Sequence, residues 1–285
     1  RNDYSGLQYA FRYAGKSSAD GFVRTNRGAV TIQQQYNISQ GQVVDSGIYW
    51  RNTLEVPGRN TIRTALAWLP RHYDDIDSRG NGAYETDDRI WWNVLWATDA
   101  SKMFSWSFGV GGIQENLGDW TGQYSIGVTA RPTNSLMIKA DIKYKRRDGW
   151  LVYQGGNKFG AYNGIEWQPA IEMNWFMMPR HQLRFSMQWA GVRASEQEFF
   201  EIGNSDKLIP APRTRPDYDF TVSLLTAQLR YRWEIAPLTD FYVVYNLGNR
   251  LPSLDEDGFS SLFKDTFDDP IVESFVVKLR YRFGN

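Results

Sequence analysis

The C-terminal segment Ser274-Phe275-Val276-Val277-Lys278-Leu279-Arg280-Tyr281-Arg282-Phe283 alternates two kinds of side chain. Its odd-numbered residues are all apolar or aromatic, and three of its even-numbered residues are cationic. Because successive side chains of a strand point to opposite faces, the segment predicts a β-strand with one apolar and one cationic face. A strand of this kind leaves open what its apolar face contacts, so the other segments decide the fold.

The same alternation recurs through the middle of the chain. Four successive segments keep one face apolar, and they cover residues 90–96, 104–111, 123–130 and 136–145. Later segments at residues 165–175, 183–189 and 225–234 repeat the pattern. A succession of alternating strands is typical of an antiparallel all-β protein.

The connections between these segments alternate in length. Short turns are expected at residues 57–60, 98–101, 132–134, 178–180 and 236–239, and longer loops at 71–88, 112–119, 146–160, 194–216 and 250–270. Short turns at one rim and long loops at the other are typical of bacterial outer-membrane β-barrels, with the short turns on the periplasmic side. The final alternating strand with its aromatic end resembles the closing strand of such a barrel. A soluble β-sandwich is the alternative, but it does not require strands of this length.

We therefore predict an antiparallel transmembrane β-barrel of the bacterial outer membrane with about 14 strands, short periplasmic turns and long extracellular loops. Residues 1–285 are expected to form a single barrel domain, the C-terminal part of a longer protein. About 13 strands are visible in the sequence, and barrels usually have an even number. A further strand is expected near the N-terminus or upstream of residue 1.

Composition agrees with a barrel and excludes several other classes. The mean hydropathy is −0.52, and no segment approaches the roughly 18 consecutive apolar residues that a membrane helix needs. Aromatic residues make up 15% of the chain, as two aromatic girdles would require. The absence of cysteine excludes disulfides and thiolate metal sites. With 32 basic and 32 acidic residues, net charge gives no argument for nucleic-acid binding.

Two stretches resemble a known family. Residues 19–27, with Gly21-Phe22 followed by Arg24 and Arg27, are similar to one of its segments, and residues 216–245 are similar to a second one. Both resemble the C-terminal outer-membrane barrel region of the bacterial carbohydrate-binding-family-9-like domain proteins, a barrel of unknown function. The resemblance implies an outer-membrane barrel. It carries over no binding residue, because the sugar-binding module of that family is a separate N-terminal domain.

The polar face of the expected strands would line the lumen. The charged residues assigned to it are Lys139, Asp141, Lys143, Lys145, Glu166, Glu172, Arg184, Arg230, Arg232, Glu234, Lys278, Arg280 and Arg282. Such charges select solutes in a pore, or pair with one another in a closed or plugged barrel. The sequence leaves these alternatives open.

The aromatic residues of the opposite face are assigned to the membrane interfaces. They are Trp92, Trp96, Trp106, Trp167, Trp175, Trp189, Trp233, Tyr281 and Phe283. Stacking on sugars is the alternative role for the tryptophans.

Residues with catalytic or metal-binding chemistry are few. His72 lies beside Asp74 and Asp75 in an expected rim loop and is the one candidate general base. The acidic stretch at residues 255–257 lacks the ligand spacing of an EF-hand, and Gly155-Gly156 precedes no helix that could bind phosphate. We therefore expect no enzyme, no metal and no cofactor.

The sequence thus predicts a pore, or a membrane scaffold for a periplasmic or surface protein partner, in the bacterial outer membrane. Its surroundings would be outer-membrane lipid and lipopolysaccharide, without nucleic acid. A glycan-binding or uptake component is the first alternative, and a hydrolase at the barrel rim is the second.

Overall fold

The structure is a computed structural model that describes residues 3–17, 21–213, 218–253, 258–268 and 270–281. Its regular structure is almost entirely β-strand, with one helical turn, η1 (Pro57–Arg59), and one helix, α1 (Phe259–Asp268). Across this described part, no helix has the length and apolar character needed to cross a membrane. The predicted all-β class is confirmed.

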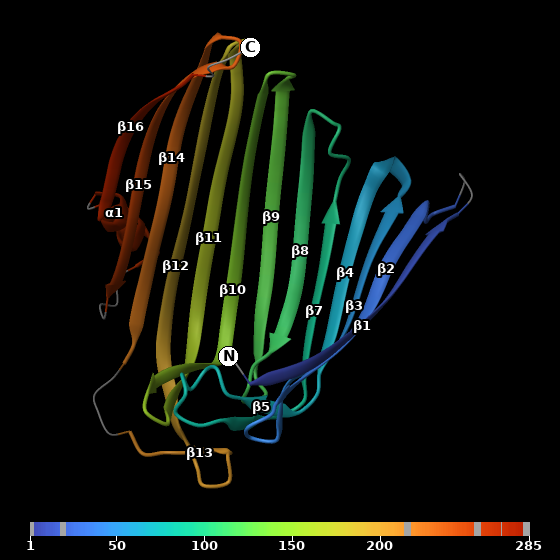
Figure 1. Cartoon of the computed structure of the whole chain (residues 1–285), viewed down its shortest axis with the longest axis vertical. Coiled ribbons are helices and arrows are strands. Elements are labelled where there is room, and N and C mark those ends of the chain that lie inside the picture. Colours follow the sequence, from blue (N-terminus) through green and yellow to red (C-terminus); the bar gives the residue numbers. More distant parts are fainter. Residues whose placement is uncertain (1–2, 18–20, 214–217, 254–257, 269, 282–285) are drawn as a thin grey trace.

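One large antiparallel sheet makes up most of the molecule (Figure 1). It has 14 strands, of which 13 follow one another along a single path while β13 (Leu208–Pro210) pairs with β12 beside that path. The strands of the path are β1 (Tyr4–Lys16), β2 (Thr25–Asn37), β3 (Gln42–Val56), β4 (Asn60–Leu69), β7 (Arg89–Ala97), β8 (Phe104–Gln114), β9 (Trp120–Thr133), β10 (Leu136–Gly155), β11 (Lys158–Met178), β12 (His181–Ile202), β14 (Phe220–Ala236), β15 (Thr239–Ser253) and β16 (Val272–Arg280). Two short strands, β5 (His72–Asp74) and β6 (Tyr84–Thr86), form a separate hairpin.

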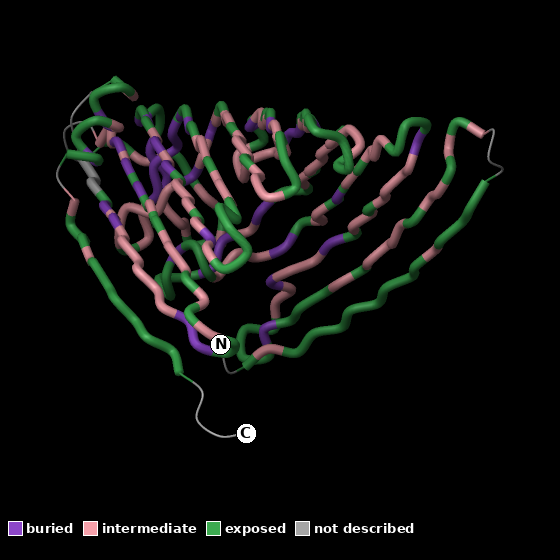
Figure 2. Tube along the Cα trace, turned by 90° about the horizontal axis from the view of Figure 1, so that it is seen from above, coloured by how far each residue is buried: buried purple, intermediate pink, exposed green. Residues whose placement is uncertain are grey.

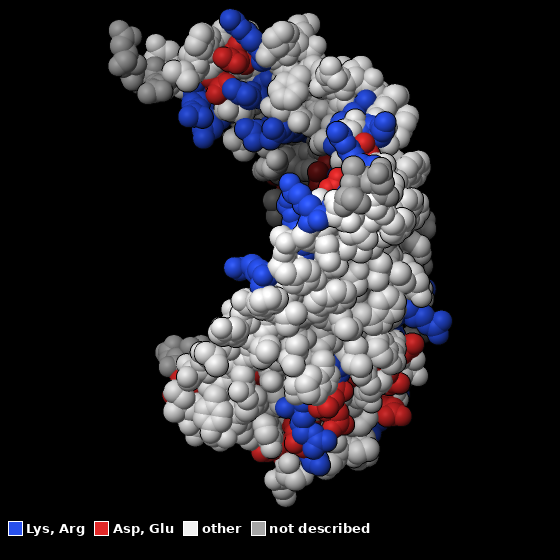
Figure 3. Space-filling model, turned by 90° about the vertical axis from the view of Figure 1, so that its right-hand side faces the viewer, with Lys and Arg blue, Asp and Glu red and all other residues white. Residues whose placement is uncertain are grey.

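The sheet is curved but open, so the predicted closed barrel is not formed by these strands. In the part of the chain that the structure describes, β1 and β16 are the two edges and do not pair with each other. Figure 2 shows these edge strands on two separate arms, and Figure 3 shows the crescent profile that results. The period of 2 determines which face each side chain takes, but it carries no information on whether two distant strands meet.

The two ends of the sheet differ in their connections, in part as the sequence predicted; the β2–β3 and β10–β11 connections are short although they lie at the end where long loops were expected. At one end, short connections such as η1 and residues 179–180 join neighbouring strands. At the other end lie the long connections at residues 70–88 and 203–219 and the segment that contains α1. Strands β10, β11 and β12 have 20, 21 and 22 residues, respectively, and extend well beyond their neighbours at this end.

The loops predicted at residues 146–160 and 194–216 are therefore largely wrong. β10 and β11 continue to a tight turn in which Gly155 (φ 112°) and Gly156 (φ 60°) adopt left-handed backbone angles. At these extended ends, Tyr84 from the connection between β4 and β7 packs in one buried cluster with Leu151, Phe159 and Phe200. This contact joins segments far apart in sequence, and period-2 analysis does not detect it.

A second small core lies under helix α1. Leu262 of the helix packs against Trp189 of β12, Leu225 of β14 and Leu247 of β15. The helix thus covers three neighbouring strands, and it does so on the face that carries large apolar side chains. The sequence predicted a loop here.

Candidate functional site: the polar face of the sheet

Strand register brings the predicted charged residues of β10 and β11 together on one face. Direct cross-strand pairs are Lys139 with Glu172, Lys143 with Gln168, and Lys145 with Glu166. Asp141 lies in the same row of β10, between Lys139 and Lys143, opposite Ala170. Because side chains that face each other across an antiparallel pair interact directly, this face is a continuous array of polar groups.

Glu166 is the centre of the most buried charged cluster on this face. Its side chain is 7% exposed and accepts hydrogen bonds from Arg147 (Nη2 2.7 Å, Nε 3.2 Å) and Lys145 (3.3 Å). The amide of Gln168 donates to the same carboxylate. The guanidinium of Arg147 also stacks over the ring of Trp150 at 4.5 Å. Two cations therefore share one carboxylate, and the sequence had identified only one of them, Lys145.

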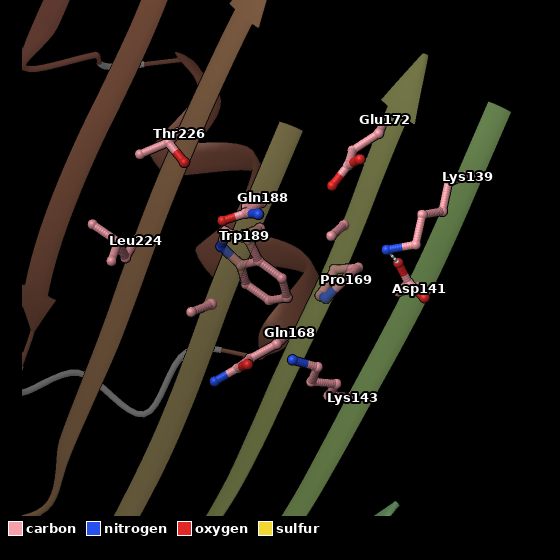
Figure 4. A pocket seen from close by; sticks show the side chains of 12 residues that line it. Lys139, Asp141, Lys143, Gln168, Pro169, Glu172, Gln188, Trp189, Leu224 and Thr226 are labelled. Carbon is pink, nitrogen blue, oxygen red and sulfur yellow. Dashed lines mark ion pairs between the residues drawn. The ribbon is translucent and has the colours of Figure 1, made fainter. Parts of the chain in front are cut away.

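A cavity of about 390 Å³ lies next to this cluster, where Ala170 leaves space among longer side chains. Figure 4 shows its lining, which includes the Lys139–Asp141 ion pair (2.7 Å), Lys143 and Glu172. The remaining lining residues are Gln168, Pro169, Ala170, Gln188, Trp189, Ala190, Leu224 and Thr226. Charged groups of both signs, amides and a hydroxyl can all form hydrogen bonds to a polar molecule here.

The cavity reaches between two strands. The ladder of β11 and β12 is interrupted between the pairs Trp167–Gly191 and Ala170–Gln188. Pro169 lies in this interval and has no N–H group to donate to the ladder. Trp189, whose ring belongs to the opposite face, consequently forms part of the cavity lining.

Trp189 is buried rather than exposed on the apolar face, which corrects its assignment to the membrane interface. Its side chain packs against Phe263 of α1, with the rings 5.4 Å apart and nearly perpendicular. Its indole N–H donates to Ser223 Oγ (2.8 Å), and Ser223 in turn donates to the carbonyl of Leu262 (3.1 Å). In Figure 4 the helix runs behind the strands that carry the cavity lining, as the alternation of side chains requires.

The other tryptophans assigned to the interfaces share the apolar face. Register connects Trp96 to Phe108, Trp106 to Val128, and Trp175 to Leu183 across neighbouring strands. Trp96, Trp106, Trp167, Trp175 and Trp233 are 38–45% exposed, Trp92 is half-buried, and Tyr281 is 57% exposed. Phe283 lies outside the described residues. Their place at a membrane interface remains a prediction.

The second half of the predicted polar residues gathers at the end of the sheet with the short turns. Arg184 of β12 lies directly opposite Arg230 of β14. Arg232 follows Arg230 on the same face, and its guanidinium pairs with Asp240 of β15 at 2.8 Å. Glu234, Lys278 and Arg280 share this face by register, and Arg282 lies outside the described residues.

Neither histidine forms a hydrogen bond or ion pair with a carboxylate in the described residues. His72 is buried, and its Nδ1 lies 2.8 Å from the carbonyl of Pro70 and 3.3 Å from Thr86 Oγ1. His181 Nδ1 contacts the Tyr231 hydroxyl at 2.6 Å, and its ring stacks on Trp233. Across the described ranges, no group of three or more His, Cys, Asp or Glu residues is placed to hold a metal.

Sequence reasoning missed Arg147, Asp240 and helix α1. Arg147 was placed in a loop because the pattern of β10 is broken by an irregularity in register between Arg147 and Trp150. Asp240 directly follows a short turn, where its alternation with Tyr242 was the available signal. The α1 segment contains Phe259, Leu262, Phe263 and Phe267 at helical spacing, which was a signal for an amphipathic helix.

The chain belongs to the family described as a domain of unknown function, DUF5916, which matches residues 1–283. No curated protein matches it. Among solved structures, the fold is similar to the FrpB iron transporter from Neisseria meningitidis (F3-3 variant), with a TM-score of 0.53 and 11% sequence identity. The match covers 98% of this chain and 48% of the transporter chain, so this chain spans about half the length of that structure. At this identity the likeness concerns the fold alone.

Proposed function

We propose that this chain forms the wall of a β-barrel in the bacterial outer membrane and that its polar face lines an aqueous pore. The observation that carries the proposal is the contrast between the two faces. On β8, Phe104, Trp106 and Phe108 are 52%, 45% and 42% exposed, while Ser105 between them is buried. A continuous exposed face of large apolar side chains is what a lipid-facing wall requires and what a soluble sheet avoids.

The distribution of charge on the surface supports the same orientation. In the view of Figure 3, charged side chains gather mainly toward the two ends, and a broad uncharged zone lies between them. Such a zone matches the hydrocarbon layer of a membrane, with the charged ends in the polar regions on either side.

Closure requires partners for the two edge strands. On β1, Leu7, Tyr9 and Phe11 are 75%, 71% and 63% exposed, and on β16, Phe275 and Leu279 are 67% and 61% exposed. Long apolar edge strands leave a row of backbone groups unpaired, which lipid cannot satisfy. We infer that further strands pair with both edges in the membrane.

Conductance of the full-length protein in a planar lipid bilayer tests the pore. Stable current steps are expected, and Lys143→Glu should change their ion selectivity because this exposed cation lies at the cavity on the polar face. Ile142→Ala, one residue away on the apolar face, is the matched control and should leave the selectivity unchanged. Absence of conductance from protein shown to be folded would reject the pore and leave a membrane scaffold for a periplasmic or surface partner.

Glycan uptake is a second proposal, favoured by the composition of the cavity. Gln168, Gln188, Glu172 and Thr226 offer donors and acceptors that suit sugar hydroxyls. Soluble dextrins should then interrupt the current in wild-type channels, and Gln188→Leu should shorten the interruptions. Currents unaffected by dextrins would argue against this specificity while leaving the pore itself intact.

A further inference from the structure

Five cations converge on the polar face at the end of the sheet with the short turns. Arg184 lies directly opposite Arg230 across β12 and β14. In the next row, Arg232 is opposite Tyr242 of β15, which is opposite Lys278 of β16, and in the row after that Asp240 is opposite Arg280. We call Arg184, Arg230, Arg232, Lys278 and Arg280 the cationic patch.

Acidic groups neutralise only part of this patch. Asp240 pairs with Arg232 at 2.8 Å, and Glu234 of β14 lies opposite Asp240 on the same face. In the described part of the chain, Arg184, Arg230, Lys278 and Arg280 form no ion pair. Arg230 instead stacks over the ring of Tyr242 at 4.8 Å.

Several other cations of the polar face are paired, although Lys143 of β10 forms no ion pair in the part of the chain that the structure describes. On β10 and β11, Lys139 pairs with Asp141, and Lys145 and Arg147 both pair with Glu166. Like charges placed directly opposite each other on neighbouring strands destabilise a sheet, by about as much as a favourable pair stabilises it. The repulsion between Arg184 and Arg230 therefore destabilises the folded sheet locally, and a bound anion would remove this repulsion.

We propose that the cationic patch binds oxyanion groups, phosphate or carboxylate, and makes the pore selective for small anionic solutes. The planar guanidinium group presents N–H donors in a fork that matches these oxyanions, and three of the five cations are the adjacent Arg184, Arg230 and Arg232. Oxyanion binding is inferred from the geometry of the patch alone, whereas the anion selectivity also depends on the proposed pore.

Binding is tested first, without reference to conduction. Inorganic phosphate should raise the urea midpoint of unfolding of the full-length protein in detergent micelles above that in chloride of equal ionic strength, because a ligand that binds the folded state stabilises it. The Arg184→Gln/Arg230→Gln double variant should lose this phosphate-specific shift. Lys102→Gln removes an exposed cation from a short turn at the same end of the sheet, outside the patch, and should retain the full shift.

Ion selectivity in a planar bilayer then tests the role in transport. The wild-type reversal potential in a potassium chloride gradient should indicate anion preference, and Arg230→Glu should shift it toward cation preference. Phosphate binding without conductance would reject the pore but keep the binding site. Conductance without anion preference and without the phosphate shift would overturn the binding site and leave the pore. A phosphate shift that survives in the double variant would also overturn the assignment to this patch.

Discussion

Replacing Glu166 by glutamine tests whether the charge cluster of β10 and β11 stabilises the sheet. The variant keeps the shape of the side chain but removes the charge that Lys145 and Arg147 share at 3.3 and 2.7 Å. Hydrogen bonds to charged groups contribute about 1.5–3 kcal/mol each. Because the two cations are 25% and 20% exposed, water replaces part of what they lose. We expect the free energy of unfolding to fall by about 2 kcal/mol in total. This is less than the roughly 3–5 kcal/mol that breaking a fully buried ion pair costs.

The assay is urea unfolding in detergent micelles, followed by tryptophan fluorescence. The midpoint should fall while the slope stays unchanged, because the surface exposed on unfolding is the same. Glu172→Gln, on the same strand and face, is the control. Lys139, the cross-strand neighbour of Glu172, already pairs with Asp141. The free energy of unfolding of this control should therefore fall by less than about 0.5 kcal/mol. Equal midpoints for the two variants would refute the reasoning.

Two further substitutions probe helix α1 and the long connection between β4 and β7. Trp189→Ala should cost about 3–5 kcal/mol and expose α1 to cleavage at Lys264, because it removes the buried ring beneath the helix. Trp167→Ala, which removes a half-exposed ring, should leave the proteolysis pattern unchanged, and identical patterns for both variants would contradict the packing seen here. Asp77 is exposed at its surface, but partial desolvation of its carboxyl and, secondarily, the nearby Asp74 raise the pKa of that carboxyl in the folded chain. A raised pKa means that this group favours the folded state at low pH and that its contribution is lost as pH rises through the raised value. Asp77→Asn should therefore unfold at a higher urea concentration than wild type at pH 7, with a smaller difference at pH 4; a variant less stable than wild type at pH 7 would oppose this.

The sequence predicted the faces of the strands better than their ends. The alternation of Lys139, Asp141, Lys143 and Lys145 with apolar residues determined the polar face of β10, because a slip of one residue would bury every charge. It did not predict that β10 continues past Arg147. There the strand is stabilised by contact with Tyr84, which is distant in sequence.

Local sequence patterns could not predict helix α1 or the open edges of the sheet, because both depend on contacts between segments that are distant in sequence. A ten-residue helix is marginal in isolation, and α1 is held by the apolar surface that Trp189, Leu225 and Leu247 provide from three strands. The cationic patch was predicted residue by residue, but the facing positions of Arg184 and Arg230 follow from the register of β12 and β14. Closure of the sheet depends on strands that pair with β1 and β16, and alternation within a strand does not reveal its partners.

The central claim is that one face of this sheet contacts lipid and the other contacts water. The chain contains no cysteine, so single cysteines introduced into the full-length protein at Ile138, Lys139, Ile142 and Lys143 can each carry one fluorescent label. In lipid vesicles, we predict that quenchers attached to lipid tails act on labels at 138 and 142, and that aqueous iodide acts on labels at 139 and 143. Labels at all four positions quenched equally by iodide, and by lipid-borne quenchers at none, would contradict a membrane wall.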